Sequence, residues 1–144
     1  MLPHTYHRNL TDLKKNIVLR DTASNAMNSV LPIAVLRKSF IINDIPEDIF
    51  FTTDERLITI VLSDILSNTI SSSSNSCIRI SAKKEQDEIL IIIRDNHSDY
   101  SRYISGKMMK VKPIVKKLGG QIRFEFNQRE SISVILSFCT KSLI

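Results

Sequence analysis

Apolar residues follow the period of a helix over two stretches in the first half of the chain. The segment DERLITIVLSDILSNTI, which begins at Asp54, carries apolar residues at steps of three and four and predicts the strongest amphipathic helix. An earlier stretch predicts a helix that is capped by Asp21 or Thr22 and runs to about Lys38. Pro32 falls inside this helix and should bend it, because proline removes one backbone hydrogen bond.

Strand patterns dominate the second half of the chain. CIRISA at 77–82 alternates between apolar and polar residues, which predicts a half-buried strand. EILIIIRD at 88–95 is apolar on both faces, and this pattern indicates a central strand of a sheet. The segments 121–126 and 131–138 alternate on either side of NQRE and predict a hairpin.

The remaining elements are shorter. A helix is predicted over 107–118, with Pro113 as its weak point, and Gly119 with Gly120 should stop it. Short extended segments are predicted at 16–19, 40–43 and 49–52.

The order of these elements indicates the fold class. A helix-rich first half is followed by strand, strand, helix, strand and strand, which predicts an α/β protein. We expect a two-layer sandwich, in which a mixed, mostly antiparallel sheet carries about three helices on one face. Residues 1–15 are polar and poorly patterned, so we expect a linker or the end of a preceding helix there and one domain over 16–144.

The amino-acid composition further narrows the kind of protein that the sequence indicates. The chain has 144 residues, of which 42% are hydrophobic and 24% charged, as expected of one globular domain. The longest strictly apolar run is Ile89–Ile93, far shorter than the roughly 20 residues of a transmembrane helix, and we expect a cytoplasmic protein. Cys77 and Cys139 lie in predicted strands without a CxxC spacing, which favours reduced thiols over a metal site.

The chain is basic, with a formal net charge of +5. Part of this charge lies in GKMMKVKPIVKK, at 106–117, where lysines are interleaved with apolar residues. A solvated helix face is the usual source of this pattern, and the segment lacks aromatic residues that would stack on bases. A nucleic-acid-binding domain is therefore an alternative that rests on this segment alone, and nucleic acid is not the partner that we expect.

Three polar residues interrupt otherwise apolar patterns. Asp64 and Asn68 lie one turn apart on the predicted helix that begins at Asp54, and Asp95 ends the predicted central strand. Taken singly, Asp64 is explained as an exposed acid, Asn68 as a residue near a frayed helix end, and Asp95 as a turn former. Their combination with the order of the elements suggests a more specific interpretation.

From about Ile17 to Phe138 the chain resembles the ATP-binding, or catalytic, domain of sensor histidine kinases. That family belongs to the GHKL (HATPase) superfamily and has the Bergerat fold. Its members carry a helix of the form D-x-x-R-L-x-x-V-L-x-N-L-L-x-N-A, which DERLITIVLSDILSNT is similar to. The segment KKLGGQIRFEF resembles the last helix and strand of the family.

The resemblance implies a role for each polar residue, with ATP and Mg²⁺ as cofactors. Asn68 would coordinate Mg²⁺ through its amide oxygen, a ligand type that this cation accepts. Asp64 would act in catalysis by holding a water near the phosphates. Asp95 would accept a hydrogen bond from the adenine amino group, because a carboxylate accepts without donating. Asn96, which follows it, is expected to contribute to nucleotide binding.

The glycine boxes of the family are degenerate here. Members have D-x-G-x-G after the adenine-binding aspartate, whereas this chain has DNHSD, with His97 and Asp99 in place of the glycines. If the backbone needs positive φ there, each replacement costs on the order of 1 kcal/mol. Asp99 also adds negative charge near the expected phosphates. The mobile lid is shortened to DYSRYISGKMM, in which Gly106 is the single glycine.

These departures from the family pattern lead us to expect one function for the domain. A second function is the alternative, in addition to the nucleic-acid-binding domain considered above. We expect a histidine-kinase-like domain of a two-component signalling protein with impaired nucleotide binding, a pseudokinase that serves as a docking module. Its partner would be a kinase dimerisation hairpin or a response-regulator receiver, and it would need no cofactor if the site is lost. The alternative is an active domain that binds ATP and Mg²⁺ and phosphorylates a histidine. Neither His4 nor His7 is assigned as the phosphoacceptor.

Overall fold

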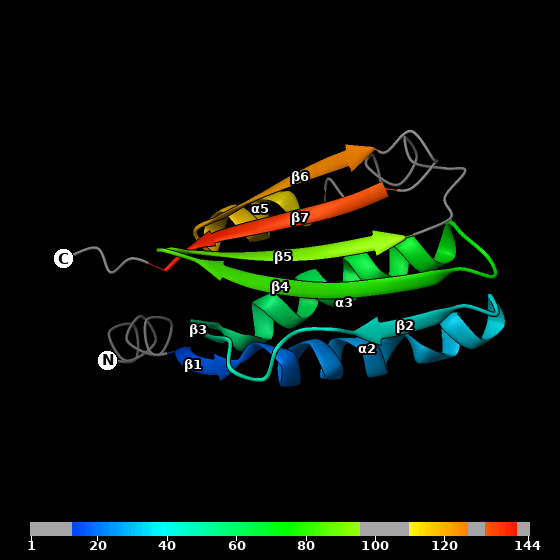
Figure 1. The fold of residues 1–144 in the computed structure, drawn as a ribbon, viewed down its shortest axis with the longest axis horizontal. Helices are drawn as coiled ribbons and strands as arrows, with labels where there is room; N and C mark the ends of the chain where they lie inside the picture. The colour runs from blue at the N-terminus through cyan, green and yellow to red at the C-terminus, as the bar shows by residue number, and fades with distance from the viewer. Residues whose placement is uncertain (1–12, 96–109, 127–131, 141–144) are drawn as a thin grey trace, which may run out of the picture.

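Five strands form the main sheet of the protein, and helices cover one of its faces (Figure 1). The computed structural model describes residues 13–95, 110–126 and 132–140. Its elements are β1 (Lys14–Val18), α2 (Leu19–Leu36), β2 (Phe40–Asn43), β3 (Phe50–Asp54), α3 (Glu55–Ser71), β4 (Cys77–Glu85), β5 (Glu88–Asp95), α5 (Lys112–Lys117), β6 (Gly120–Phe126) and β7 (Ile132–Cys139). The predicted two-layer α/β class is confirmed.

The strand order of the main sheet is β2-β4-β5-β7-β6. Only β2 and β4 pair in parallel, while the other three pairs are antiparallel, so the sheet is mixed and mostly antiparallel as predicted. The structure adds a feature that the sequence pattern did not indicate. Strands β1 and β3 pair with each other in a separate two-stranded sheet.

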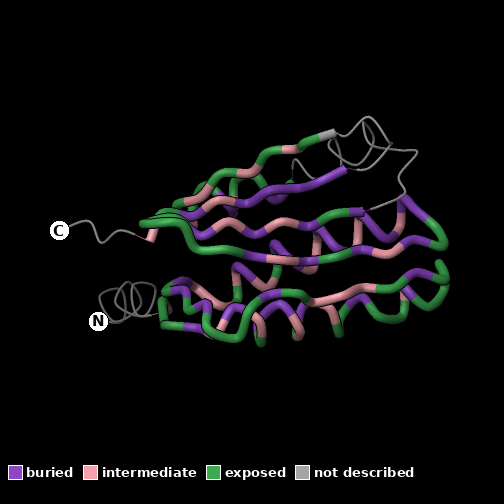
Figure 2. The backbone as a smooth tube through the Cα atoms, viewed as in Figure 1, coloured by how far each residue is buried: buried purple, intermediate pink, exposed green. Residues whose placement is uncertain are grey.

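The central strand β5 presents its two faces to different surroundings. Ile89, Ile91 and Ile93 are buried together with Asp95, whereas Leu90 and Ile92 on the opposite face are only half-buried. This alternation along β5 and along the neighbouring strand β4 is visible in Figure 2. Because side chains alternate across a strand, Asp95 lies on the same face as the three buried isoleucines. The predicted central position of this strand, between β4 and β7, is confirmed.

Helix α2 begins earlier than predicted. It starts at Leu19, and its N-cap Val18 makes no side-chain capping bond, so the prediction of a cap at Asp21 or Thr22 is wrong. The backbone N–H of Leu19 is instead satisfied by the carbonyl of Ile49 at 3.0 Å. Leu19 is fully buried, which explains why burial and not side-chain capping decides where this helix starts. Pro32 lies inside the helix as expected.

Helix α5 is shorter than predicted over the residues that the structure describes. It begins at Lys112, which places Pro113 in the first turn, where a missing N–H costs little. The predicted start at 107–109 lies outside the described residues. Lys112, Lys116 and Lys117 are exposed while Val115 is buried, as the prediction of a solvated helix face requires.

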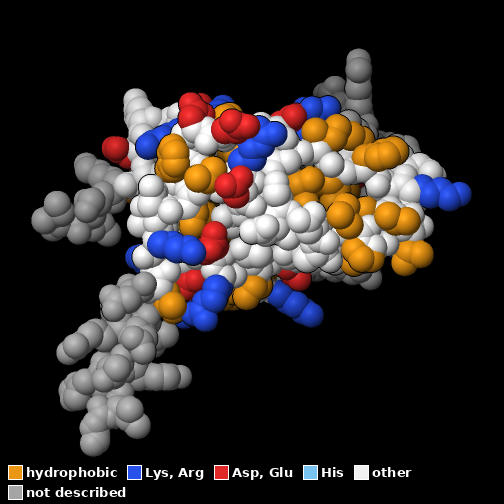
Figure 3. Space-filling view, turned by 90° about the horizontal axis from the view of Figure 1, so that it is seen from below, with side chains coloured by type: hydrophobic (Ala, Val, Ile, Leu, Met, Phe, Trp, Pro, Cys, Tyr) orange, Lys and Arg blue, Asp and Glu red, His pale blue; other side chains and the backbone are white. Residues whose placement is uncertain are grey.

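The side of the molecule along which α2 and β2 lie is not uniformly polar. Seen from below in Figure 3, hydrophobic side chains gather over its right-hand part, and acidic side chains lie mainly over the rest. Among the residues that the structure describes, no helix is both long and apolar enough to cross a membrane.

Candidate functional site

Asp95 ends the central strand β5 and is completely buried. Its neighbours across the sheet are Ile78 on β4 and Ile132 on β7, which are also buried. A carboxylate in such apolar surroundings carries a desolvation cost that a simple turn former at the surface would not carry. The position therefore differs from the exposed turn that residue type alone would favour.

Asp64 and Asn68 lie one turn apart on α3, and both are half-buried. The side-chain N–H₂ of Asn68 donates a hydrogen bond to Oδ2 of Asp64 at 3.3 Å. This bond fixes the direction of the amide, so that its oxygen points away from the carboxylate and is free of this contact. The pair thus presents carboxylate and amide oxygens, the donors that a hard cation such as Mg²⁺ accepts.

The two positions lie at the same end of the molecule. Helix α3 and strand β5 run in the same direction in Figure 1, so the second half of α3 and the end of β5 are at corresponding ends. Asp95 also lies on the helix-covered face of the sheet, as its burial with Ile91 and Ile93 indicates. That Asp64, Asn68 and Asp95 line one cavity stays a prediction.

The other predicted site residues fall in one stretch of the chain. Asn96, His97, Asp99 and the shortened lid up to residue 109 lie outside the described residues. Their expected part in nucleotide binding therefore also stays a prediction.

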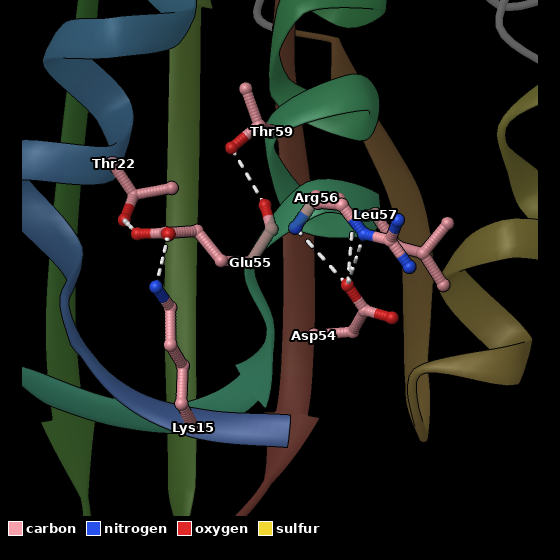
Figure 4. Close-up of polar contacts among 7 residues, drawn as sticks. All are labelled: Lys15, Thr22, Asp54, Glu55, Arg56, Leu57 and Thr59. Atoms are coloured by element: carbon pink, nitrogen blue, oxygen red, sulfur yellow. Dashed lines mark hydrogen bonds and ion pairs between the residues drawn. The ribbon is translucent and has the colours of Figure 1, made fainter. Parts of the chain in front are cut away.

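The start of α3 is held by two sets of polar contacts (Figure 4). Oδ1 of Asp54 accepts hydrogen bonds from the backbone N–H groups of Arg56 at 3.1 Å and Leu57 at 3.3 Å, so Asp54 caps the helix that was predicted to begin there. Next to it, the carboxylate of Glu55 pairs with Lys15 Nζ at 2.8 Å and accepts a hydrogen bond from the Thr22 hydroxyl at 3.2 Å.

The surroundings of Glu55 lower the pKa of its carboxyl group. The hydrogen bond from Lys15 lowers the pKa of the Glu55 carboxyl, and this effect outweighs the raising effect of partial burial. The charge of Lys15 and the hydroxyl of Thr22 lower the pKa further. This cluster ties β1, α2 and α3 together. Sequence reasoning missed it, because its three members are far apart in the chain and share no local pattern.

Two other features bear on where a ligand would bind. Among residues 13–95, 110–126 and 132–140, no three His, Cys, Asp or Glu side chains gather as a metal site. A groove of about 910 Å³ is lined by residues of β1, β3, the β4–β5 turn and the end of α5, including Lys14, Lys84 and Lys117. It lies near the start of β5, at the opposite end from Asp95, so it is not the predicted nucleotide site.

Comparison by sequence gives no relative for this chain: no protein-family model matches it, and no curated protein does. The structure, in contrast, is similar to many solved structures. The chain has the fold of the catalytic domains of sensor histidine kinases, as the resemblance implied.

Three solved structures illustrate this similarity. The histidine kinase AdeS of Acinetobacter baumannii superposes with a TM-score of 0.77 at 15% identity, over 90% of this chain and 68% of that chain. The nucleotide-free catalytic domain of the histidine kinase ThkA gives 0.75 at 14% identity, over 88% and 95% of the two chains. A histidine kinase from Burkholderia phymatum gives 0.75 at 12% identity, over 96% and 78%. At these identities the similarity concerns the fold.

Proposed function

We propose that this chain is a histidine-kinase-like ATP-binding domain of a two-component signalling protein, with impaired nucleotide binding and a role as a docking module. One observation carries the proposal. The residues to which the resemblance assigns base and metal binding are the fully buried Asp95 and the hydrogen-bonded pair of Asp64 and Asn68. The sequence that follows Asp95 has lost the glycines that the phosphates would require.

In this proposal each side chain has a definite task. Asp95 accepts a hydrogen bond from the adenine amino group in a desolvated position, where a carboxylate discriminates strongly between donors and acceptors. The amide oxygen of Asn68 binds Mg²⁺, while Asp64 holds that amide in position and orients a water near the phosphates. When bound, Mg²⁺ would neutralise the charge of the phosphates. Asn96 adds a polar group beside the base.

The phosphate half of the site is the impaired part. Glycines allow a backbone to approach phosphates closely and to adopt positive φ without cost. His97 and Asp99 stand where the family has such glycines, and Asp99 would also repel the phosphates. A domain of this kind retains the fold as a rigid surface, although it binds nucleotide weakly.

A response-regulator receiver or a kinase dimerisation hairpin is the partner that we propose. Support comes from a similar solved structure, the histidine kinase ThkA in complex with the response regulator protein TrrA. It superposes with a TM-score of 0.73 at 15% identity, and the chain matches 42% of the length of that kinase.

Calorimetric titration with a non-hydrolysable ATP analogue and Mg²⁺ tests the nucleotide part of the proposal. We expect a Kd weaker than about 100 μM, a value that corresponds to roughly 5–6 kcal/mol of binding free energy. A tighter Kd that is lost in Asp95→Ala would instead favour the alternative, an active ATP- and Mg²⁺-binding domain that phosphorylates a histidine.

Two controls make this titration decisive. Asp87→Ala removes an exposed carboxylate at the other end of the β4–β5 hairpin and should leave any binding unchanged. Thermal unfolding of Asp95→Ala shows whether the variant is folded, so that a loss of binding is not mistaken for a loss of structure. The docking part is tested separately, by titrating the ¹⁵N-labelled domain with a receiver domain in the absence of nucleotide.

A further inference from the structure

The end of α2 and the start of β2 expose an unusual set of large hydrophobic side chains. Leu31 is 46% exposed, Val35 73%, Leu36 82% and Phe40 72%. We call these four residues the apolar patch. They account for four of the six large hydrophobic side chains that are exposed among the described residues. Hydrophobic side chains also cluster on the right of Figure 3, the end at which α2 ends and β2 begins in Figure 1.

The core of this domain does not explain the apolar patch. The fully buried apolar side chains of helix α2 beyond Leu19 are small residues and one valine, Ala23, Ala26, Val30 and Ala34, and the larger Met27 and Ile33 pack on the core only in part. Its last two turns, LPIAVL at 31–36, are apolar all round, whereas its first half exposes polar side chains. A helix segment that is apolar all round is normally covered on every side.

The charge around the apolar patch has one sign. Arg37 and Lys38 lie between Leu36 and Phe40 in the chain, are exposed, and form no side-chain ion pair within the part of the chain that the structure describes. The whole segment 22–43 contains no Asp or Glu. The next acid, Asp44, is already paired with Arg79. The patch therefore offers a partner apolar contact together with two unpaired cations.

We infer that the apolar patch is a docking surface for an amphipathic helix of another protein, one whose apolar stripe is flanked by Asp or Glu. Residues 31–36 of α2 extend over about 9 Å, a little less than two turns of a partner helix. Carboxylates on that helix would meet Arg37 and Lys38, so the electrostatics of the two surfaces would be complementary.

Two other occupants fit the charges less well. A second copy of this chain would bring its own Arg37 and Lys38 to the same apolar surface, where no carboxylate offsets them. A flat anionic membrane would also meet the acidic side chains that lie over the rest of the face shown in Figure 3. A narrow helix contacts the patch and avoids those acids.

This inference does not depend on the proposed nucleotide chemistry, because the patch contains none of the residues assigned to ATP or Mg²⁺. The probes are two synthetic 16-residue peptides with the same leucine stripe, one flanked by glutamates and the other by lysines. Each is titrated into the ¹⁵N-labelled domain and followed by chemical-shift changes. We expect the glutamate peptide to bind at least tenfold more tightly, with the largest changes at residues 31–40.

Variants at exposed positions make the test specific. Val35→Ser with Leu36→Ser should weaken binding of the glutamate peptide at least tenfold, whereas Ile60→Ser removes an exposed apolar side chain from α3 and should have no effect. Arg37→Glu with Lys38→Glu should reverse the preference between the two peptides. Because all these side chains are exposed, thermal unfolding should stay close to that of the parent.

Three results would overturn the inference. The first is equal binding of the two peptides, or chemical-shift changes away from residues 31–40. The second is a dimer in sedimentation velocity that Val35→Ser with Leu36→Ser dissociates, which would assign the patch to a second copy. The third is binding to phosphatidylserine vesicles that the same variant abolishes, which would assign it to a membrane.

Discussion

Gly120→Ala should destabilise the protein, because there is no room for one more carbon atom at the start of β6. A Cβ built on Gly120 would lie 2.5 Å from Cδ1 and Cε1 of Phe138 and 2.7 Å from the carbonyl oxygen of Ser137. Phe138 is buried directly opposite Gly120 on β7, and its ring packs on that of Phe51 with a centroid distance of 5.1 Å. The ring cannot move away without disturbing that contact.

The size of the effect follows from two opposing terms. Overpacking of a well-packed core costs about 1–3 kcal/mol. Replacing glycine by alanine restricts the unfolded chain and returns about 0.4–1 kcal/mol where the backbone conformation is compatible. The free energy of unfolding of Gly120→Ala should therefore fall by about 1–2 kcal/mol, and the transition midpoint in urea should fall without a change in slope.

A double-mutant cycle identifies the cause. Phe138→Leu shortens the side chain that the new methyl group would meet, so the cost of Gly120→Ala should shrink in that background, although the Ser137 carbonyl remains close. The steric argument would be refuted if Gly120→Ala were as stable as the parent. The steric argument would also fail if Gly120→Ala lowered the free energy of unfolding equally in the parent and in the Phe138→Leu background.

Three further predictions concern the start of α3 and the predicted phosphate half of the site. Asp54→Ala should lower the free energy of unfolding by about 1 kcal/mol in urea titrations, because two capping bonds are lost, while Asp54→Asn should recover most of it. Since the pKa of Glu55 is lowered in the folded state, its contribution is present above its ordinary value of 4.5 and is lost as the pH falls through the folded pKa. Glu55→Gln should therefore make the free energy of unfolding less dependent on pH below about 4.5, by only a few tenths of a kcal/mol because the pair with Lys15 is partly exposed. His97→Gly with Asp99→Gly should strengthen ATP-analogue binding at least tenfold in calorimetry, and unchanged or weaker binding would argue against a glycine-box defect.

Local sequence patterns were sufficient to predict those structural features that depend on residues close together in the chain. Helix α3 starts at its cap Asp54 as predicted, because its first turn is held by bonds between residues that are two and three positions apart. The continuous apolar run of β5 identified it as central, since a strand that is apolar on both faces is typical of the interior of a sheet. The side-by-side placement of Asp64 and Asn68 likewise follows from the period of a helix.

Contacts between distant segments account for what the sequence pattern did not reveal. The two glycines after α5 read alike in the sequence, yet Gly119 adopts a φ of +80° after the helix, whereas Gly120 is required by the ring of Phe138. The cluster of Lys15, Thr22 and Glu55 exists only because three elements meet.

The sequence by itself determined the type and order of the elements and the residues that resemble an ATP-binding site, because periodicity and capping act over a few residues. Only the tertiary structure decided that β1 pairs with β3 outside the main sheet, that α2 begins at the buried Leu19, and that Leu36 and Phe40 remain exposed. The physical reason is that burial is a property of the whole packed chain. The sequence around an apolar residue does not indicate whether a distant segment of the chain packs against it.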